Sequence, residues 1–178
     1  ADDPDLRLLE VDVNTAFYDT AHVPGAACVD WRTDLRSADS HDILAPDEMA
    51  SFLGSHGITT ETTVVVYGDN SNWFAAHLYW QLTYYGHPDV RIMDGGREYW
   101  MDYGYPTTTD PVNLPTVEYG SSLAPPAKPG VRAYRDDVQD ALDTETAFID
   151  VRLPEEFSGA ITKPPGIDEG AMRGGHIP

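Results

Sequence analysis

Residues 19–26 read DTAHVPGA, and residues 173–178 read RGGHIP. The tripeptide His-x-Pro therefore occurs twice, at His22 and at His176, and the chain stops where the first copy continues with Gly-Ala. An internal repeat decides the architecture of a chain before any single motif does. We therefore expect one complete copy of a repeated unit, followed by the beginning of a second copy.

The similarity between the two copies extends upstream of the histidines. LEVD at residues 9–12 has a counterpart in IDVR at residues 149–152, and Phe17 has one in Phe157. Positions 10 and 150 are 140 residues apart, whereas the histidines are 154 apart, so the second copy has fourteen extra residues between these points. Most of the second copy, and any chemistry that it carries, would then lie beyond residue 178.

The composition is strongly acidic. The 178 residues contain 30 Asp and Glu against 11 Lys and Arg, which gives a formal net charge of −19. Nucleic acid is excluded as a partner because polyanions are bound by basic patches. A disordered acidic chain is also excluded, since 41% hydrophobic and 11% aromatic residues suffice for a core. At molar salt the Debye length falls to about 3 Å, so we expect a folded protein adapted to a salt-rich cytoplasm.

Cysteine usage and hydropathy favour a cytoplasmic protein. The single Cys28 argues against a disulfide framework and is expected to be a buried structural thiol in a reducing compartment. No run of eighteen apolar residues and no basic-then-apolar leader is present, so neither a membrane span nor an export signal is expected. The start at Ala1, without Met, suggests a trimmed N-terminus.

Alternating strands and helices predict an α/β fold with a mainly parallel sheet. The run VVVY at residues 64–67, bounded by Gly68, is typical of a strand buried on both faces of such a sheet. The other predicted strands cover residues 8–11, 26–31 and 90–93. Four helices are predicted. The first starts at Pro46 and ends before Gly57, and the second runs from a cap at Ser71 to Tyr85. The third passes through Trp100 and ends at Gly104, and the fourth covers residues 136–142.

A stretch rich in Pro, Thr and Ser separates the two copies. We expect a first domain over residues 1–118, a linker over 119–130 and the truncated second domain over 131–178. An edge strand is predicted at residues 116–119, and the first strand of the second copy at 147–151. A piece of about 48 residues is too small to bury its own core. It must lean on the first domain, associate with another chain or be disordered.

The loop from Gly68 to Asn72 (GDNSN) is the expected ligand site of the first copy. In a parallel α/β sheet, ligands bind at the carboxyl ends of strands, where backbone N–H groups converge at helix N-termini. Such a loop can hold an anion or lower the pKa of a thiol. This one contains no Cys, Lys, Arg or His, so it carries no nucleophile of that kind.

Several segments together resemble the rhodanese family of sulfurtransferases in its tandem two-domain form. The matching segments are DTAHVPGA (19–26), the strand and loop at 64–69, YGHPDV (85–90), MDGGREYW (93–100), FIDVRLPEEFSG (148–159) and RGGHIP (173–178). The resemblance implies a three-layer sandwich with helices on both faces of a mainly parallel sheet. It also implies that the first domain is a non-catalytic copy, because Gly68 stands where the second domain of the family has its nucleophilic Cys.

The resemblance further implies the chemistry of the parent protein. A loop Cys, expected near position 222 of a longer chain, attacks the outer sulfur of thiosulfate and passes the persulfide sulfur to a thiophilic acceptor such as cyanide. The partners are thus a small anionic sulfur donor and that acceptor, with no cofactor. Arg173 is the candidate substrate-binding cation, and Gly68, Asp69, Asn70, Ser71 and Asn72 form a vestigial loop. This chain alone is expected to be inactive.

Alternatives remain open at this point. The chain could belong to a non-catalytic rhodanese-fold module used for binding or regulation, whereas a phosphatase of this fold is disfavoured by Gly68. The donor could equally be 3-mercaptopyruvate, and self-association through the second copy is open.

Asp69 is expected to be a solvated loop acid, His22 and His176 to form hydrogen bonds, and Arg32 to lie in a surface ion pair or a cleft wall. No metal is expected from the spacing of candidate ligands. The aromatic residues expected to pack the core or a domain interface are Trp73, Trp80, Tyr84 and Trp100.

Overall fold

The chain forms two compact units. The structure, a computed structural model, describes residues 3–38, 42–120, 123, 130–167 and 170–178. Contacts along the backbone group residues 1–132 into unit 1 and residues 133–178 into unit 2. The predicted domain boundaries stay predictions, and most of the expected linker lies outside the described residues.

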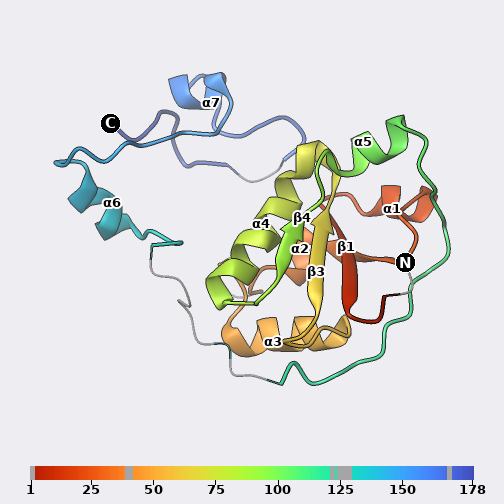
Figure 1. The fold of residues 1–178 in the computed structure, drawn as a ribbon. Coiled ribbons are helices and arrows are strands. Elements are labelled where there is room, and N and C mark those ends of the chain that lie inside the picture. Colours follow the sequence, from red (N-terminus) through yellow and green to blue (C-terminus); the bar gives the residue numbers. More distant parts are fainter. Residues whose placement is uncertain (1–2, 39–41, 121–122, 124–129, 168–169) are drawn as a thin grey trace. The chain divides into compact units, whose positions relative to one another are not determined.

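Unit 1 is built on a parallel sheet of four strands in the order β2-β1-β3-β4 (Figure 1). The strands are β1 (Leu6–Asp12), β2 (Ala26–Asp30), β3 (Thr63–Tyr67) and β4 (Val90–Ile92). The central β1 pairs with both β2 and β3, so that Leu8 lies opposite Ala26 on one side and Val65 on the other. The four predicted strands of this unit are confirmed, except that Trp31 begins a helix and does not end β2.

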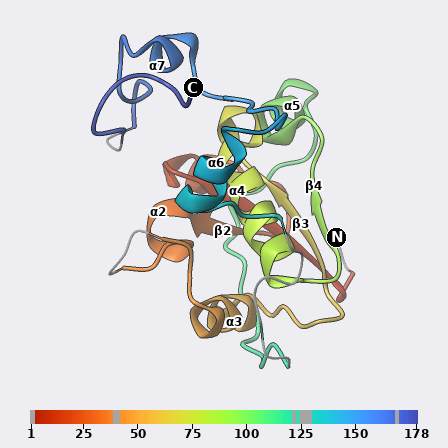
Figure 2. The same ribbon diagram turned by 90° about the vertical axis from the view of Figure 1, so that its left-hand side faces the viewer.

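Helices cover both faces of this sheet, as Figures 1 and 2 show. They are α1 (Ala16–Thr20), α2 (Trp31–Asp34), α3 (Pro46–Ser55), α4 (Asp69–Tyr85) and α5 (Gly96–Asp102). The apolar spacing of α4 buries Phe74, Leu78 and Leu82 against β1, β3 and β4. Tyr67 points to the opposite face of the sheet, where it forms a cluster with Val23 and Ala26. Trp100 of α5 packs against this cluster. Among the described residues, no helix has the length and apolarity needed to cross a bilayer.

Residues 106–120, called the strap below, run in an extended form along unit 1 from α5 to α3 (Figure 1). Thr108 exchanges two backbone hydrogen bonds of 2.9 Å with His22, and Val117 N donates to Gly54 O at 3.0 Å. Tyr119 is buried, with its hydroxyl 2.9 Å from His87 Nδ1. The predicted edge strand at residues 116–119 is wrong, because the Val117 N–H bonds to a helix carbonyl and not to a neighbouring strand.

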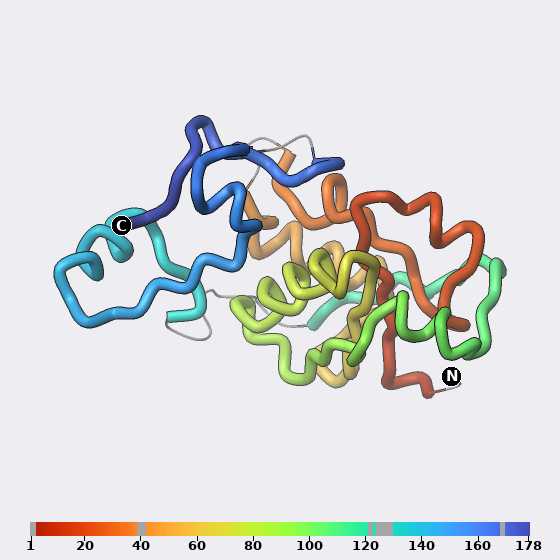
Figure 3. Tube along the Cα trace, turned by 90° about the horizontal axis from the view of Figure 1, so that it is seen from above, coloured from red at the N-terminus to blue at the C-terminus, as the bar shows by residue number. Residues whose placement is uncertain are grey.

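Unit 2 contains two short helices, α6 (Arg135–Ala141) and α7 (Pro154–Ser158), traced in Figure 3. The predicted helix at residues 136–142 is confirmed, but the predicted strand at residues 147–151 is wrong. A strand needs hydrogen bonds from a neighbouring strand, and the described residues of unit 2 offer none. As a result Ile149 and Val151 are 84% and 90% exposed, whereas their counterparts Leu9 and Val11 in β1 are fully buried.

Two glycines bring the backbone of unit 2 close to itself after α7. A Cβ added to Gly159 would lie 2.9 Å from Gly175 N, and one added to Gly174 would lie 2.5 Å from Gly159 O. Gly159 also ends α7 with φ 83°, a left-handed value that favours glycine. The backbone at residue 159 therefore lies next to the backbone at residues 174 and 175.

Candidate functional site

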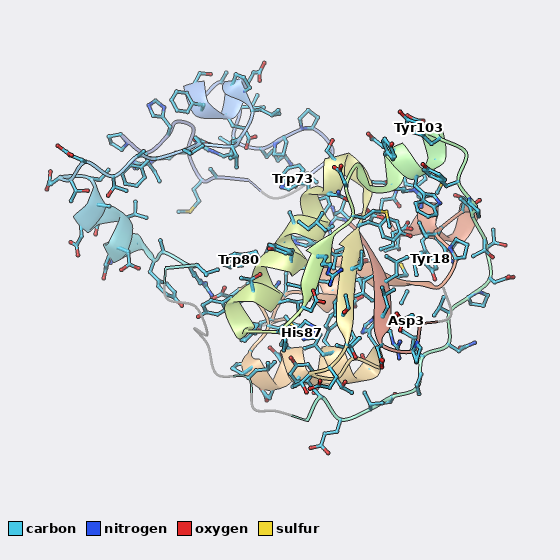
Figure 4. All side chains as sticks on the ribbon, viewed as in Figure 1. Asp3, Tyr18, Trp73, Trp80, His87 and Tyr103 are labelled. Carbon is cyan, nitrogen blue, oxygen red and sulfur yellow. The ribbon has the colours of Figure 1, made fainter. Side chains whose placement is uncertain are left out.

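The loop Gly68–Asn72 follows β3 at the carboxyl edge of the sheet, directly before Trp73 of α4, which Figure 4 labels. Asn70, Ser71 and Asn72 have φ values of 50°, 55° and 66°, so three consecutive non-glycine residues lie in the left-handed region. Such residues cost on the order of 1 kcal/mol each and persist only where their surroundings hold them. Ser71, predicted as a helix cap, lies within this left-handed turn instead.

Asn72 holds the two ends of this loop together. Its Oδ1 accepts a hydrogen bond from Gly68 N at 3.0 Å, and its Nδ2 donates to Met93 O at 2.8 Å. Gly96 at the start of α5 allows this approach, because a Cβ there would lie 2.5 Å from Asn72 Oδ1. The loop shape is thus fixed from the neighbouring β4–α5 turn.

Asp12, the last residue of β1, closes the loop from the other side. Its Oδ1 accepts a hydrogen bond from Asp69 N at 2.7 Å, and the residue is only 3% exposed. Burial raises the pKa of this carboxyl to about 7, and the negative charges of Asp69 and Glu10 act in the same direction. Asp12 therefore changes its charge close to neutral pH.

A buried ion-pair network lies beside Asp12. Arg97 of α5 donates through Nη1 to Glu10 Oε1 at 2.7 Å, and its Nε lies 3.2 Å from Asp69 Oδ1. The hydroxyl of Tyr67 donates to the other oxygen of Glu10, and it accepts from Val23 N at 3.1 Å. Burial raises the pKa of Glu10, opposed by Tyr67 and Arg97. Two carboxyl groups, those of Glu10 and Asp69, thus share one guanidinium.

Sequence reasoning predicted a loop directly after β3, which the structure has, but it missed this network. Asp69, expected to be a solvated acid, is paired with Arg97. A signal was available in the pattern of β1, where Glu10 and Asp12 alternate with Leu9 and Val11 in a strand predicted to be buried. Charged residues are almost never fully buried unless they are paired, so each of these two acids required a partner.

Gly68 stands at the position of the expected nucleophile, and its surroundings leave no room for a side chain. A Cβ at this residue would lie 2.3 Å from Val11 O and 2.9 Å from Asp12 Oδ1. Contacts below 3.0 Å to a backbone oxygen cannot be relieved by a side-chain rotation, since the strand itself would have to move. The loop of unit 1 is therefore built around glycine.

Cys28 is the only thiol of the chain and lies in β2. It lines a hollow of about 410 Å³ together with Tyr18, His56 and strap residues 111–114. Burial raises its pKa to about 12, and surrounding carboxylates, Glu10 and Asp12 first, add to the shift. Because the thiolate is the reactive form, this position is unsuited to nucleophilic chemistry. Within the described residues, no group of three His, Cys, Asp or Glu side chains could hold a metal ion.

In unit 2 the candidate Arg173 lines an open hollow of about 740 Å³. Arg152 lines the same hollow and was missed by sequence reasoning, although it ends the IDVR segment of the repeat. Arg152 makes a two-pronged pair with Asp150, at 2.9 Å from Nε and 2.6 Å from Nη2. Two cationic side chains therefore border one concave surface in a strongly acidic chain.

The two histidines of the repeat have the same local structure. His22 stacks on Tyr18 with ring centroids 3.7 Å apart, and its Nδ1 lies 2.8 Å from Tyr18 O. His176 stacks on Phe157 at 3.8 Å, and its Nδ1 lies 2.8 Å from Phe157 O. The hydrogen-bonding role predicted for both is confirmed. The counterpart of Phe157 is Tyr18, however, and not Phe17, which is half exposed.

The hollow of unit 2 corresponds to filled space in unit 1. The segment FIDVR that lines it matches LLEVD of β1, which is flanked by β2 and β3 and contacted by Tyr67 and Arg97. Those neighbours have no counterpart in the described residues of unit 2. The large volume is accordingly the unfilled interior of a repeat, so its size alone does not mark a substrate pocket.

The predicted aromatic residues divide into buried and exposed groups. Tyr84 is buried, whereas Trp73 is 54% exposed. Trp80 donates to Val131 O at 2.8 Å, and Trp100 donates to Pro106 O at the same distance. Arg32 lies exposed on α2. Core packing therefore accounts for only part of this set.

Comparison with known proteins gives consistent matches along the chain. The model of the rhodanese-like domain matches residues 1–103. The "Putative thiosulfate sulfurtransferase" of Haloferax volcanii is 52% identical over 178 residues, which is all of this chain and 61% of that protein. The "Sulfur carrier protein TtuD" of Thermus thermophilus is 42% identical over 99% of this chain and 63% of its own length. The chain thus spans about three fifths of these curated relatives.

Solved structures of YnjE and of EanB also superpose along most of the chain. The crystal structure of YnjE superposes with a TM-score of 0.78 at 25% identity, covering 93% of this chain and 40% of that one. A structure of EanB that carries a Cys persulfide superposes with a TM-score of 0.78 at 28% identity, covering all of this chain and 44% of the other.

Proposed function

This chain belongs to the rhodanese-like family, and from that premise we propose that it is the first repeat, with the start of the second, of a tandem sulfurtransferase that moves sulfane sulfur from thiosulfate to a thiophilic acceptor. The observation that carries the proposal is the 52% identity, along its entire length, to a relative named for thiosulfate sulfurtransfer. The net charge of −19 supports a salt-rich cytoplasm as the setting.

The proposed reaction takes place at a loop Cys that this chain does not contain. The thiolate attacks the outer sulfur of thiosulfate, the S–S bond of the donor breaks, and sulfite leaves with the bonding electrons. The resulting persulfide then gives its outer sulfur to an acceptor such as cyanide and regenerates the thiolate. Gly68 and the raised pKa of Cys28 support the assignment of this step to the second repeat.

Arg173 and Arg152 are the proposed cations for the anionic donor in the second repeat. Both border the concave side of the FIDVR segment, and a guanidinium offers paired donors to an oxyanion. In a chain with 11 basic and 30 acidic residues, a local cation is needed to offset repulsion of thiosulfate. His176, stacked on Phe157, orients the turn that follows Arg173.

The test is a thiosulfate and cyanide assay that measures thiocyanate. Residues 1–178 should give no turnover above buffer, whereas the uninterrupted protein from the same reading frame should be active. Replacing Arg173 with Ala in that longer protein should raise the KM for thiosulfate, and replacing it with Lys should restore part of the loss. Turnover by the 178-residue chain, or none by the longer protein, contradicts the proposal.

A second candidate is a non-catalytic module of the same fold, used for binding or regulation. The loop of unit 1, where glycine and a buried carboxylate stand in place of a nucleophile, fits this candidate as well as the first. It predicts that no Cys follows His176 at about the distance that separates His22 from Gly68. The reading frame beyond Pro178 decides between the two candidates.

A further inference from the structure

The loop of unit 1 lies where ligands bind in parallel α/β sheets, and the carboxylate of Asp12 is hydrogen-bonded to its backbone. We propose that the Asp12 carboxylate is an internal anion that occupies this loop and keeps the anionic sulfur donor out of unit 1. Asp12 would then determine which repeat takes the donor. The identity of the donor rests on the proposed function, whereas the occupation of the loop rests on the geometry of unit 1.

The first support is the position of the carboxylate. β1 ends at Asp12, and this places Oδ1 2.7 Å from Asp69 N, the N–H that follows Gly68 in the loop after β3. A backbone N–H of the loop at the carboxyl edge of a parallel sheet is where a bound anion would be held. Since Asp12 is almost fully buried, the carboxylate is part of the folded interior and does not compete from solvent.

The second support is the charge around the loop. Asp12 faces Glu10 on β1, Asp69 at the start of α4 and Arg97 on α5, while the neutral thiol of Cys28 lies on β2. Arg97 is the only cation in this group and already pairs with both Glu10 and Asp69. A second anion would therefore meet unpaired negative charge.

The third support is the repeat itself. The offset of 140 residues that aligns LEVD with IDVR places Arg152 at the position of Asp12. The two copies thus carry opposite charges at the carboxyl end of the same segment. An acid there repels thiosulfate from unit 1, whereas in the second copy the Arg152 guanidinium, paired with Asp150, adds no net negative charge at this position.

The proposal is tested by titrating the ¹⁵N-labelled chain with thiosulfate at pH 8, where Asp12 is ionised, and at constant ionic strength. In the unsubstituted chain, the amides of residues 68–72 should show no saturable shift. In Asp12→Ala the amides of residues 69–72 should shift saturably, because the donor N–H is released. The matched control is Glu98→Gln, which removes an exposed charge beside Asp69 and Arg97 without freeing an N–H, and should behave like the unsubstituted chain.

A second measurement keeps the proposal testable where Asp12→Ala fails to fold. The Asp69 amide resonance should titrate with a midpoint near pH 7 in the unsubstituted chain, because burial raises the pKa of Asp12 to about 7. This titration should disappear in Asp12→Asn, whose amide oxygen accepts the same hydrogen bond without ionising. A saturable thiosulfate shift in the unsubstituted chain, none in folded Asp12→Ala, or an unchanged titration in Asp12→Asn overturns the proposal. Loss of turnover in the longer protein would instead refute the proposed function and leave these amide shifts unaffected.

Discussion

Arg97 Nη1 and Glu10 Oε1 are 2.7 Å apart, although 87 residues separate them in sequence, and the two side chains are only 9% and 1% exposed. Arg97→Ala leaves the Glu10 carboxylate buried without its counter-charge, which costs about 3–5 kcal/mol in comparable sites. We expect a loss of this size in the free energy of unfolding, measured by urea titration at fixed salt.

The matched control is Arg91→Ala, which removes an equally short ion pair with Asp89 whose side chains are 65% and 40% exposed. Water screens solvent-exposed pairs, so Arg91→Ala should destabilise the chain much less than Arg97→Ala does. Equal losses in the two variants would show that the Glu10–Arg97 pair is not buried in solution.

Asp12 makes the stability of unit 1 depend on pH. Its folded pKa of about 7 lies above the ordinary aspartate value of 3.8, so the folded state binds the extra proton between these values. This contribution is fully present below pH 4 and is lost as the pH rises through 7, by up to about 4 kcal/mol. The difference in unfolding free energy between the unsubstituted chain and Asp12→Asn should therefore fall from pH 4 to pH 8. A difference that rises with pH would contradict it.

A cysteine placed in unit 1 at the position where the family has its nucleophile should not create activity. Gly68→Cys places a Cβ 2.3 Å from Val11 O, so the loop or β1 must shift. We expect a loss of stability on the order of 1–3 kcal/mol from this overpacking and no thiocyanate formation. Cys28→Ser in the same background removes the only other thiol as a control. Turnover by Gly68→Cys would show that the loop adapts to a side chain.

The 178-residue chain should self-associate through the uncovered segment of unit 2. Ile149 and Val151 are 84% and 90% exposed in an extended segment without strand partners, and such segments pair with other chains. Sedimentation velocity should show concentration-dependent association that Ile149→Lys with Val151→Lys abolishes. Met172→Lys changes an equally exposed residue outside the segment and should have no effect. A monomer at all concentrations would contradict this prediction.

Local patterns sufficed for the sheet of unit 1. The VVVY run at residues 64–67 and the apolar spacing of residues 74, 78 and 82 gave β3 and α4, because their partners lie in the same unit. The same reasoning failed for residues 147–151, where an equally apolar run has no neighbour to pair with. Strand propensity is a statement about the surroundings as much as about the residues.

The position of the loop after β3 was predictable from the sequence, but the side chains that contact the loop were not. The glycine after β3 located the loop, yet nothing in GDNSN indicated that Asp12 and Arg97 close it from β1 and α5. These contacts join residues 57 and 28 positions apart, and they depend on how strands and turns meet at the sheet edge. Only the alternation of acids in β1 pointed to them.

The close approach of Gly159 and Gly174 has a consequence for how the repeats diverged. Four residues separate Tyr18 from His22, but nineteen separate Phe157 from His176, and the ring stack is the same. Because the two ends of the insertion lie side by side, the second copy is longer without a displacement of the turn that contains the histidine. Insertions or deletions between residues 159 and 174 would thus leave the stacked pair of Phe157 and His176 in place.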